Sequence, residues 1–467
     1  MKNHHPSSTE QIPVDLSEGD SNLSSMRKVW HKNEIDANTR RWLALDERYF
    51  LRQTLSTPCL NVLDSCGESV IKDLQGKRYL DFHGNSVHQV GFSHPKVIDA
   101  IIDQLKKLSF CTRRYTNIPA IELAKKLSEI APGNLSKVLF APGGTTAVGM
   151  ALKLARTVTG RFKTISMWDS FHGASLDCMS ISGETMFRKN VGPLLPGAVH
   201  VPPADRYRCL WDPEGNCEIC GLKCADYIDY VLEKEGDVSA LIAEPVRNTA
   251  VNPPPPGYWK AVRKSFDRHG ALLIFDETAI CLGRTGKMFA CENFDVVPDI
   301  LTIGKGLGGG IMPFAAMIAR PDLDVAPEKG LGHYTHEKNP VASAAALATI
   351  AVIEENNLAE RTCCLGKVAV QKLNLMKDKH MLIGDVRGIG LLMGIDLVRD
   401  RKTKQRAISE AEQIMYECLK RGLSFKTSQG SCIPLSPSLT IEQSELERAL
   451  DILDEAISVV EYKLPIF

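Results

Sequence analysis

The stretch that decides the fold is Pro298-Asp299-Ile300-Leu301-Thr302-Ile303-Gly304-Lys305-Gly306-Leu307-Gly308-Gly309-Gly310. Residues 300–303 have the character of a short strand that is apolar on both faces, which is typical of a buried strand in a parallel sheet. A lysine and a glycine-rich turn follow directly. Because an ammonium group is costly to bury, Lys305 is either solvated or chemically used. Taken alone, a solvated lysine at a strand end is the simpler interpretation.

Short apolar strands of the same kind occur on both sides of this stretch. Strands alternate with helical patterns, which predicts an α/β domain with a mostly parallel sheet covered by helices on both faces. After about residue 342 the pattern changes to two helices, two strands and two further helices, which indicates a smaller α+β domain. The further buried strands are predicted at 138–140, 164–168, 240–243, 271–275 and 314–318.

The length of 467 residues favours two or three structural units. We divide the chain into an N-terminal arm (1–40), an N-terminal segment that packs with the small domain (41–95), a large domain (96–342) and a C-terminal small domain (343–467). The formal net charge is zero, and no apolar run is long enough to span a bilayer. We therefore expect no nucleic-acid or membrane partner and a cytoplasmic location.

Polar residues follow several of the predicted strands, where open α/β sheets bind their ligands. Asp276 ends the strand 271–275, and a protonated pyridine nitrogen would be a partner for its carboxylate; a helix N-cap is an equal alternative. The turn 143–146, Gly-Gly-Thr-Thr, leads into a helix and could hold a phosphate. Phe171 could lie on a flat heterocycle. Each signal is weak alone, but together with Lys305 they supply a complete cofactor site in one domain.

Taken together, these motifs resemble the class III (ω-type) aminotransferases, a family of fold type I enzymes that use pyridoxal 5′-phosphate (PLP). The resemblance runs from about Leu60 to Leu450 and so covers most of the chain. Its most specific pieces are Asp276-Glu277, Gly283 to Ala290, Pro298-Asp299-Ile300, Gly304 to Gly310, Glu244-Pro245-Val246 and Asn339-Pro340.

The resemblance implies a role for each matching residue. Lys305 would carry PLP covalently and Asp276 would pair with its pyridinium nitrogen, which makes these two the catalytic residues. Thr335 would add a phosphate contact from the neighbouring subunit, which implies a homodimer with shared active sites. The remaining cofactor-binding residues would be Gly144 and Thr145 at the phosphate, Phe171 on the ring, His172 and Glu244.

Three departures from the family pattern bear on the reaction. Ala279 stands where the aminotransferases usually have a glutamine that reaches the cofactor's phenolic oxygen, and Thr146 stands where they usually have glutamate. The segment Ser431–Leu439 contains no arginine, although the family commonly places one there to hold a substrate carboxylate in bidentate fashion. The missing arginine argues against a transaminase reaction with a 2-oxo acid.

Some members of the superfamily are lyases that act on small amino-alcohol phosphates or phosphonates. The overall resemblance, backed by the missing arginine, implies an ammonia-lyase that eliminates from a small hydroxy-amino phosphonate, with an ω-aminotransferase as the alternative. A cofactor-free scaffold is disfavoured, because it would need neither Asp276 nor Lys305. Candidate substrate contacts are Arg113, Arg114 and His88, with Arg247 as a further cation, whereas Lys426 is expected on a solvated face.

Four of the fourteen cysteines are clustered in a predicted insert of the large domain at 205–225. They are Cys209, Cys217, Cys220 and Cys224, with the spacing C-x7-C-x2-C-x3-C. One C-x2-C pair resembles half of a zinc knuckle, but the other spacings are irregular. Four reduced cysteines that pack a loop are the preferred interpretation, a structural zinc site is the alternative, and no catalytic metal is expected.

Overall fold

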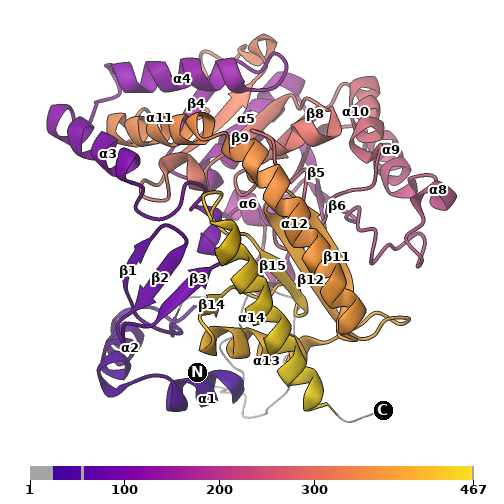
Figure 1. Ribbon diagram of the computed structural model, residues 1–467. Helices are drawn as coiled ribbons and strands as arrows, with labels where there is room; N and C mark the ends of the chain where they lie inside the picture. Colours follow the sequence, from indigo (N-terminus) through magenta and orange to yellow (C-terminus); the bar gives the residue numbers. More distant parts are fainter. Residues whose placement is uncertain (1–24, 54–56, 465–467) are drawn as a thin grey trace, which may run out of the picture.

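The computed structural model describes residues 25–53 and 57–464 of the chain. Its centre is a seven-stranded sheet in the order β4-β10-β9-β8-β7-β5-β6 (Figure 1). The strands from β9 to β6 run parallel, whereas β10 is antiparallel to both of its neighbours, so the predicted mostly parallel sheet is confirmed. The strands are β4 (Lys137–Ala141), β5 (Lys163–Met167), β6 (Ala198–Val201), β7 (Val238–Ala243), β8 (Leu272–Asp276), β9 (Ile300–Ile303) and β10 (Ala315–Ala319).

Both faces of this sheet are covered, because the side chains of each strand alternate between two apolar cores. In β8, Leu272 and Ile274 pack in one core, whereas Leu273 and Phe275 pack in the other. The ring of Phe275 meets the ring of Trp259 edge-on at a centroid distance of 4.7 Å. The first core contains helices α5 (Gly144–Thr159) and α6 (Leu176–Ile181), and the second contains α9 (Lys223–Glu235) and α10 (Tyr258–His269).

The N-terminal segment is tied to the C-terminal part of the chain through a second sheet. Its strands β1 (Leu63–Gly67), β2 (Val70–Asp73) and β3 (Arg78–Asp81) are antiparallel. The fourth strand, β14 (Leu423–Ser424), pairs in parallel with β3. Figure 1 shows this indigo hairpin beside the yellow C-terminal elements. The exact domain borders stay a prediction, and residues 1–24 of the predicted arm lie outside the described residues.

Two helices follow the N-terminal segment and pack on a later helix of the chain. Helices α3 (Pro95–Lys107) and α4 (Ile118–Ile130) pack on α11 (Pro340–Glu355). None of the described helices is both long and apolar enough to cross a bilayer. The remaining elements are α1 (Ser25–Asn33), α2 (Ala37–Tyr49), η1 (Gly84–Ser86), α7 (Thr185–Arg188), α8 (Cys217–Cys220), η2 (Ala290–Phe294), η3 (Lys305–Gly308), η4 (Pro321–Leu323), α12 (Leu358–Lys379), β11 (Ile383–Ile389), β12 (Leu392–Asp400), β13 (Gln405–Arg406), α13 (Ile408–Lys420), β15 (Cys432–Leu435) and α14 (Gln443–Tyr462).

A buried histidine directly after α12 connects the end of that helix to α14. His380 is only 2% exposed, and its two ring nitrogens lie 2.7 Å from Asp454 Oδ1 and 2.8 Å from Glu461 Oε2. Burial acts to lower the pKa of His380, but the hydrogen bonds to both carboxylates outweigh it, so the pKa is raised. The charged histidine therefore stabilises the fold below its unfolded pKa, and this contribution is lost as the pH rises through the folded pKa.

We expect His380→Gln to lower the free energy of unfolding by about 2 kcal/mol at pH 6, because hydrogen bonds to charged groups are lost. The difference from the wild type should be smaller at pH 9, because a higher pH removes the proton from more of the wild-type histidine. Urea unfolding at the two pH values measures both effects. The control is His269→Gln, because His269 pairs with Asp229 at the surface and should change little. Equal losses at pH 6 and pH 9 would contradict the assignment of a charged His380.

Candidate active site

The two predicted catalytic residues lie at the carboxyl ends of neighbouring strands. Asp276 ends β8 and stands beside Thr302 of β9 in the parallel register. Lys305 follows β9 by two residues and begins η3 with a φ of 46°, in the left-handed region that non-glycine residues rarely adopt. Such strain is stored mainly at functional sites. The sheet thus places a carboxylate and an amine at one edge, as the sequence predicted.

Asp276 is 5% exposed and receives four hydrogen bonds. His172 Nδ1 lies 2.9 Å from Oδ2. The backbone N–H and the hydroxyl of Thr278 donate to Oδ1 at 3.1 and 2.6 Å, and the Thr302 hydroxyl donates to the same oxygen at 3.0 Å. Burial acts to raise the pKa of Asp276, but the bonds from His172 and Thr278 outweigh it and lower the pKa. Asp276 is therefore a carboxylate at neutral pH.

The predicted phosphate cup lies where β4 leads into α5. Gly143 is the N-cap of this 16-residue helix and offers no side chain to its free N–H groups. The Thr146 hydroxyl donates to Gly143 O at 2.7 Å, so it serves the turn itself. A Cβ on Gly173 would collide with Oγ1 of Thr145, so the loop with Phe171 and His172 packs directly against the start of α5. The free amides and the Thr145 hydroxyl suit an anion.

The loop between β5 and α6 carries the predicted ring-stacking residue. Phe171 is half-buried, and its ring packs on Phe187 at a centroid distance of 4.6 Å. His172 is buried, and its Nε2 atom has no hydrogen-bond partner among the described residues. That Phe171 lies on the cofactor ring stays a prediction. His172, in contrast, contacts Asp276 directly, which places it behind the carboxylate.

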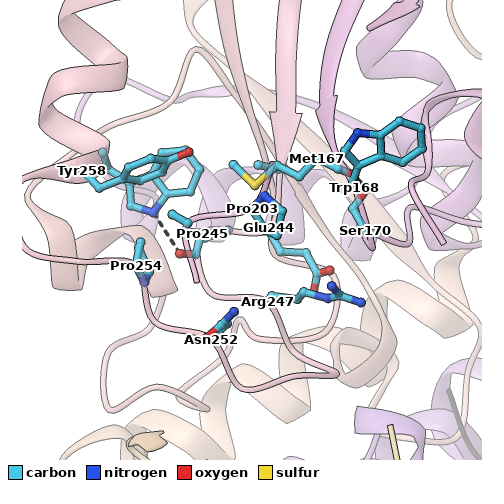
Figure 2. A pocket seen from close by; sticks show the side chains of 13 residues that line it. Met167, Trp168, Ser170, Pro203, Glu244, Pro245, Arg247, Asn252, Pro254 and Tyr258 are labelled. Carbon is cyan, nitrogen blue, oxygen red and sulfur yellow. Dashed lines mark hydrogen bonds between the residues drawn. The ribbon is translucent and has the colours of Figure 1, made fainter. Parts of the chain in front are cut away.

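Glu244 follows β7 and lines a hollow with Trp168, Arg247 and Tyr258 (Figure 2). Its Oε2 atom accepts a hydrogen bond from Asn248 N at 2.9 Å, and burial raises its pKa. Arg247 Nη2 lies 3.1 Å from Glu184 Oε1 and Nη1 lies 3.7 Å from Asp169. Burial raises the pKa of Glu184 to about 7. Arg247 is thus already engaged by two acidic side chains within the chain.

The candidate substrate contacts are placed differently from one another. His88 is fully buried, and burial lowers its pKa to about 3, so the structure places a neutral ring in the core and not at a substrate surface. Arg113 and Arg114 are exposed on the loop between α3 and α4, and Arg113 Nε pairs with Glu337 at 2.9 Å. The prediction that Lys426 lies on a solvated face is wrong: it is half-buried, and burial lowers its pKa to about 7.

Thr335 lies near the arginine loop on the surface of the chain. It is exposed, and its neighbours His336, Glu337 and Lys338 contact Phe110, Arg113 and Asn117 respectively. Thr335, which the resemblance assigned to a neighbouring subunit's site, therefore lies two residues from Glu337, the partner of Arg113.

The cysteine-rich insert forms α8 and the start of α9. All four cysteines are free, and no group of three or more histidine, cysteine or carboxylate side chains in the described part of the chain is arranged to hold a metal ion. The insert instead contacts a C-terminal part of the chain. Arg208 Nη2 pairs with the buried Asp396 at 2.8 Å, and Lys404 donates to the carbonyl of Tyr207 at 2.7 Å. The insert thus contacts strand β12 and the turn that follows it.

Three further polar residues surround the two predicted catalytic side chains and were not among the residues predicted from the sequence. Thr278 and Thr302 both donate to Asp276, and His83 lies close enough to Lys305 for the two charges to interact. Burial, with a smaller effect of Lys305, lowers the pKa of His83 to about 4. A hydroxyl inside the otherwise apolar strand Ile300–Ile303 was the signal for Thr302, because a buried hydroxyl requires a partner.

The residues that the strands bring together fit PLP in three respects. The N-terminus of α5 offers unfilled N–H groups to a phosphate. Asp276 is an ionised, buried carboxylate that suits a pyridinium nitrogen, and Lys305 lies one strand away from it. Lys305, Asp276, Gly144 and Thr145 would hold the cofactor, with His172 behind Asp276.

Comparison with known proteins gives the same assignment. The family model for class-III aminotransferases matches residues 54–457. The (R)-1-hydroxy-2-aminoethylphosphonate ammonia-lyase of Vibrio splendidus (strain 12B01) is 48% identical to this chain over 456 residues, 95% of each protein. The leucine/methionine racemase of Thermococcus litoralis is 40% identical and covers 83% of this chain and 88% of its own.

Solved structures agree with this assignment. The aminotransferase from Bacillus anthracis superposes with a TM-score of 0.84 at 30% identity, over 90% of this chain and 98% of its own. The (S)-enantioselective omega-transaminase from Thermomicrobium roseum reaches a TM-score of 0.85 at 26% identity, over 90% and 98%. With the matched family model and these relatives, the chain belongs to the class-III aminotransferase family and is a PLP-dependent enzyme.

Proposed function

We propose that this enzyme is an ammonia-lyase that converts (R)-1-hydroxy-2-aminoethylphosphonate to phosphonoacetaldehyde and ammonia. The observation that carries the proposal is the 48% identity to the Vibrio splendidus ammonia-lyase along 95% of both chains. The aminotransferase reaction is the alternative, because the family model and the solved neighbours carry that name.

The small domain supports the lyase over the transaminase. Segment 431–439, which has no arginine, includes the fully buried strand β15. Three arginines come from other elements and surround Asp396: Arg208 lies at 2.8 Å, Arg387 at 3.2 Å and Arg406 at 4.0 Å. Since they share this carboxylate and further acidic neighbours, they are poorly suited to replace the missing carboxylate anchor for a 2-oxo acid.

The site residues suit an elimination. PLP, when bound, supplies an electron-withdrawing ring that stabilises negative charge on the substrate carbon next to nitrogen. In the proposed reaction the amine of Lys305 removes a proton from that carbon, and Asp276 stabilises the positive ring nitrogen. The hydroxyl on the neighbouring carbon leaves with a proton as water. One water then returns when the released imine hydrolyses, so the products balance the substrate without an amino acceptor.

We expect the PLP-loaded enzyme to release ammonia and an aldehyde steadily from (R)-1-hydroxy-2-aminoethylphosphonate with no 2-oxo acid present. The reason is that the elimination returns the cofactor to its starting form in each turnover. Ammonia and aldehyde are measured separately over many turnovers. Ammonia that stops at about one equivalent of enzyme, or that requires pyruvate, would contradict the lyase.

The matched control is 2-aminoethylphosphonate, which keeps the amine and the phosphonate but lacks the hydroxyl that leaves. A lyase produces nothing from it, with or without pyruvate. An aminotransferase converts it once pyruvate is added and forms alanine. The pair of substrates therefore separates the two reactions on one preparation of enzyme.

We further propose a homodimer that works in the cytoplasm. Apolar side chains are exposed on α3 and α4, among them Leu105 (54%), Ile118 (65%) and Ile121 (54%). An exposed apolar surface of this kind is typical of a face that another protein covers. The loops with Arg113 and Thr335 contact one another close to these helices, so a second copy docked there would receive both loops near its own site.

A further inference from the structure

Thr278 contacts the carboxylate that the cofactor requires. Its hydroxyl and its backbone N–H both donate to Oδ1 of Asp276, and the Thr302 hydroxyl donates to the same oxygen. Three donors therefore act on one oxygen, while His172 Nδ1 lies against the other at 2.9 Å. Because hydrogen bonds to an ionised carboxylate stabilise its charged form, they keep the proton off Asp276.

The methyl group of Thr278 lies between two glycines. Gly144 belongs to the predicted phosphate cup, and Gly304 is the residue before Lys305. A Cβ on Gly144, at the start of α5, would lie 2.8 Å from Cγ2 of Thr278. A Cβ on Gly304, the residue before Lys305, would lie 3.0 Å from the same methyl group. One side chain therefore contacts the phosphate cup, the backbone that carries the lysine, and the carboxylate.

These two observations assign different tasks to the two ends of one side chain. The methyl group fills the space between Gly144 and Gly304, so it sets the distance between two loops. The hydroxyl stabilises the negative charge of Asp276, because it donates one of the two hydrogen bonds that Thr278 makes to this carboxylate. Valine keeps the first task and loses the second, whereas serine keeps the hydroxyl and loses the methyl group. The chain thus offers a matched pair of substitutions that separates packing from electrostatics.

We propose that Thr278 is a positioning residue that keeps the shared proton on the cofactor's ring nitrogen and off Asp276. A ring nitrogen that keeps its proton withdraws electrons more strongly, so the Thr278 hydroxyl speeds removal of the substrate proton by Lys305. Thr278 does this through Asp276 and does not touch the substrate. The proposal deepens the proposed function, and only its kinetic readout rests on that function.

The test compares Thr278→Val with Thr278→Ser in the PLP-loaded enzyme. For Thr278→Val we expect the visible absorbance band of the bound cofactor to titrate about one pH unit higher. The band follows the proton on the Lys305 nitrogen that carries the cofactor, and a less positive ring binds that proton more tightly. The kcat for ammonia release should fall by about tenfold to a hundredfold with little change in KM. Thr278→Ser should stay close to the wild type in both measurements, and the Kd for PLP should change less than about threefold in Thr278→Val.

Three outcomes would overturn the proposal. The first is an unchanged titration in Thr278→Val, and the second is a Thr278→Ser variant as impaired as Thr278→Val, which would show that the methyl group matters and not the hydroxyl. The third outcome applies if the Thr278→Val chain does not fold. Thr302→Val then serves instead, because it removes the other hydroxyl that donates to the same oxygen. An unshifted titration in Thr302→Val would overturn the proposal. The titration needs no substrate, so failure of the lyase assignment leaves it readable.

Discussion

Replacing Lys305 with alanine should reduce ammonia release by at least about a thousandfold and should abolish the visible absorbance of the purified enzyme. The loss is large because one amine performs two tasks: it carries the cofactor covalently and it removes the substrate proton. The left-handed backbone at Lys305, with a φ of 46°, is retained by alanine at a similar strain, so the loop should keep its shape. Absorbance spectra and initial rates measure the two effects.

The control for this variant is Lys264→Ala, which removes an exposed lysine from α10. It should keep both the colour and the rate of the wild type. Circular dichroism of Lys305→Ala should match the wild type, which separates lost chemistry from lost fold. A coloured Lys305→Ala enzyme that retains more than a few per cent of the rate would show that another amine holds the cofactor.

Replacing Asp276 with asparagine should lower kcat by about a hundredfold to a thousandfold, because the buried negative charge that faces the ring nitrogen is lost while the shape is kept. The pKa of Asp276 is lowered, since its hydrogen bonds outweigh burial, so the group is ionised across the neutral range. A carboxylate with a lowered pKa stabilises the folded state above its ordinary pKa, and this contribution disappears as the pH falls through the lowered value. PLP retention by the wild type should therefore weaken only in acid, below about pH 4.

Asp295→Asn is the matched control, because Asp295 pairs with Lys260 at the surface and is largely exposed. It should leave kcat and PLP retention unchanged. Dialysis at a series of pH values, followed by absorbance, measures retention for both variants. An Asp276→Asn enzyme with the kcat of the wild type would contradict the role of this carboxylate.

The central sheet could be predicted from the sequence because its strands are apolar on both faces. The strand expected at 300–303 is Ile300–Ile303 in the structure, and the strand expected at 271–275 is Leu272–Asp276. The positions of Asp276 and Lys305 followed from these strands, since parallel neighbours present their carboxyl ends together.

The surroundings of these residues could not be predicted in the same way. His172 and Asp276 form a hydrogen bond across 104 residues, and no local pattern specifies such a pair. Lys426 was misplaced because a single lysine in a polar segment has no periodicity that indicates its burial. For the cysteine insert, spacing alone left zinc open, whereas the described structure brings no metal-holding group together and ties the insert to Asp396.

The pairing of β14 with β3 has a consequence for synthesis of the chain. Leu80 of β3 lies beside Leu423 of β14, so this second sheet lacks its fourth strand until roughly 340 further residues have left the ribosome. At about 10 residues per second this takes roughly half a minute, during which β3 presents an open edge. A shortened chain that ends before residue 423 would keep that edge of β3 permanently open to pairing with another chain.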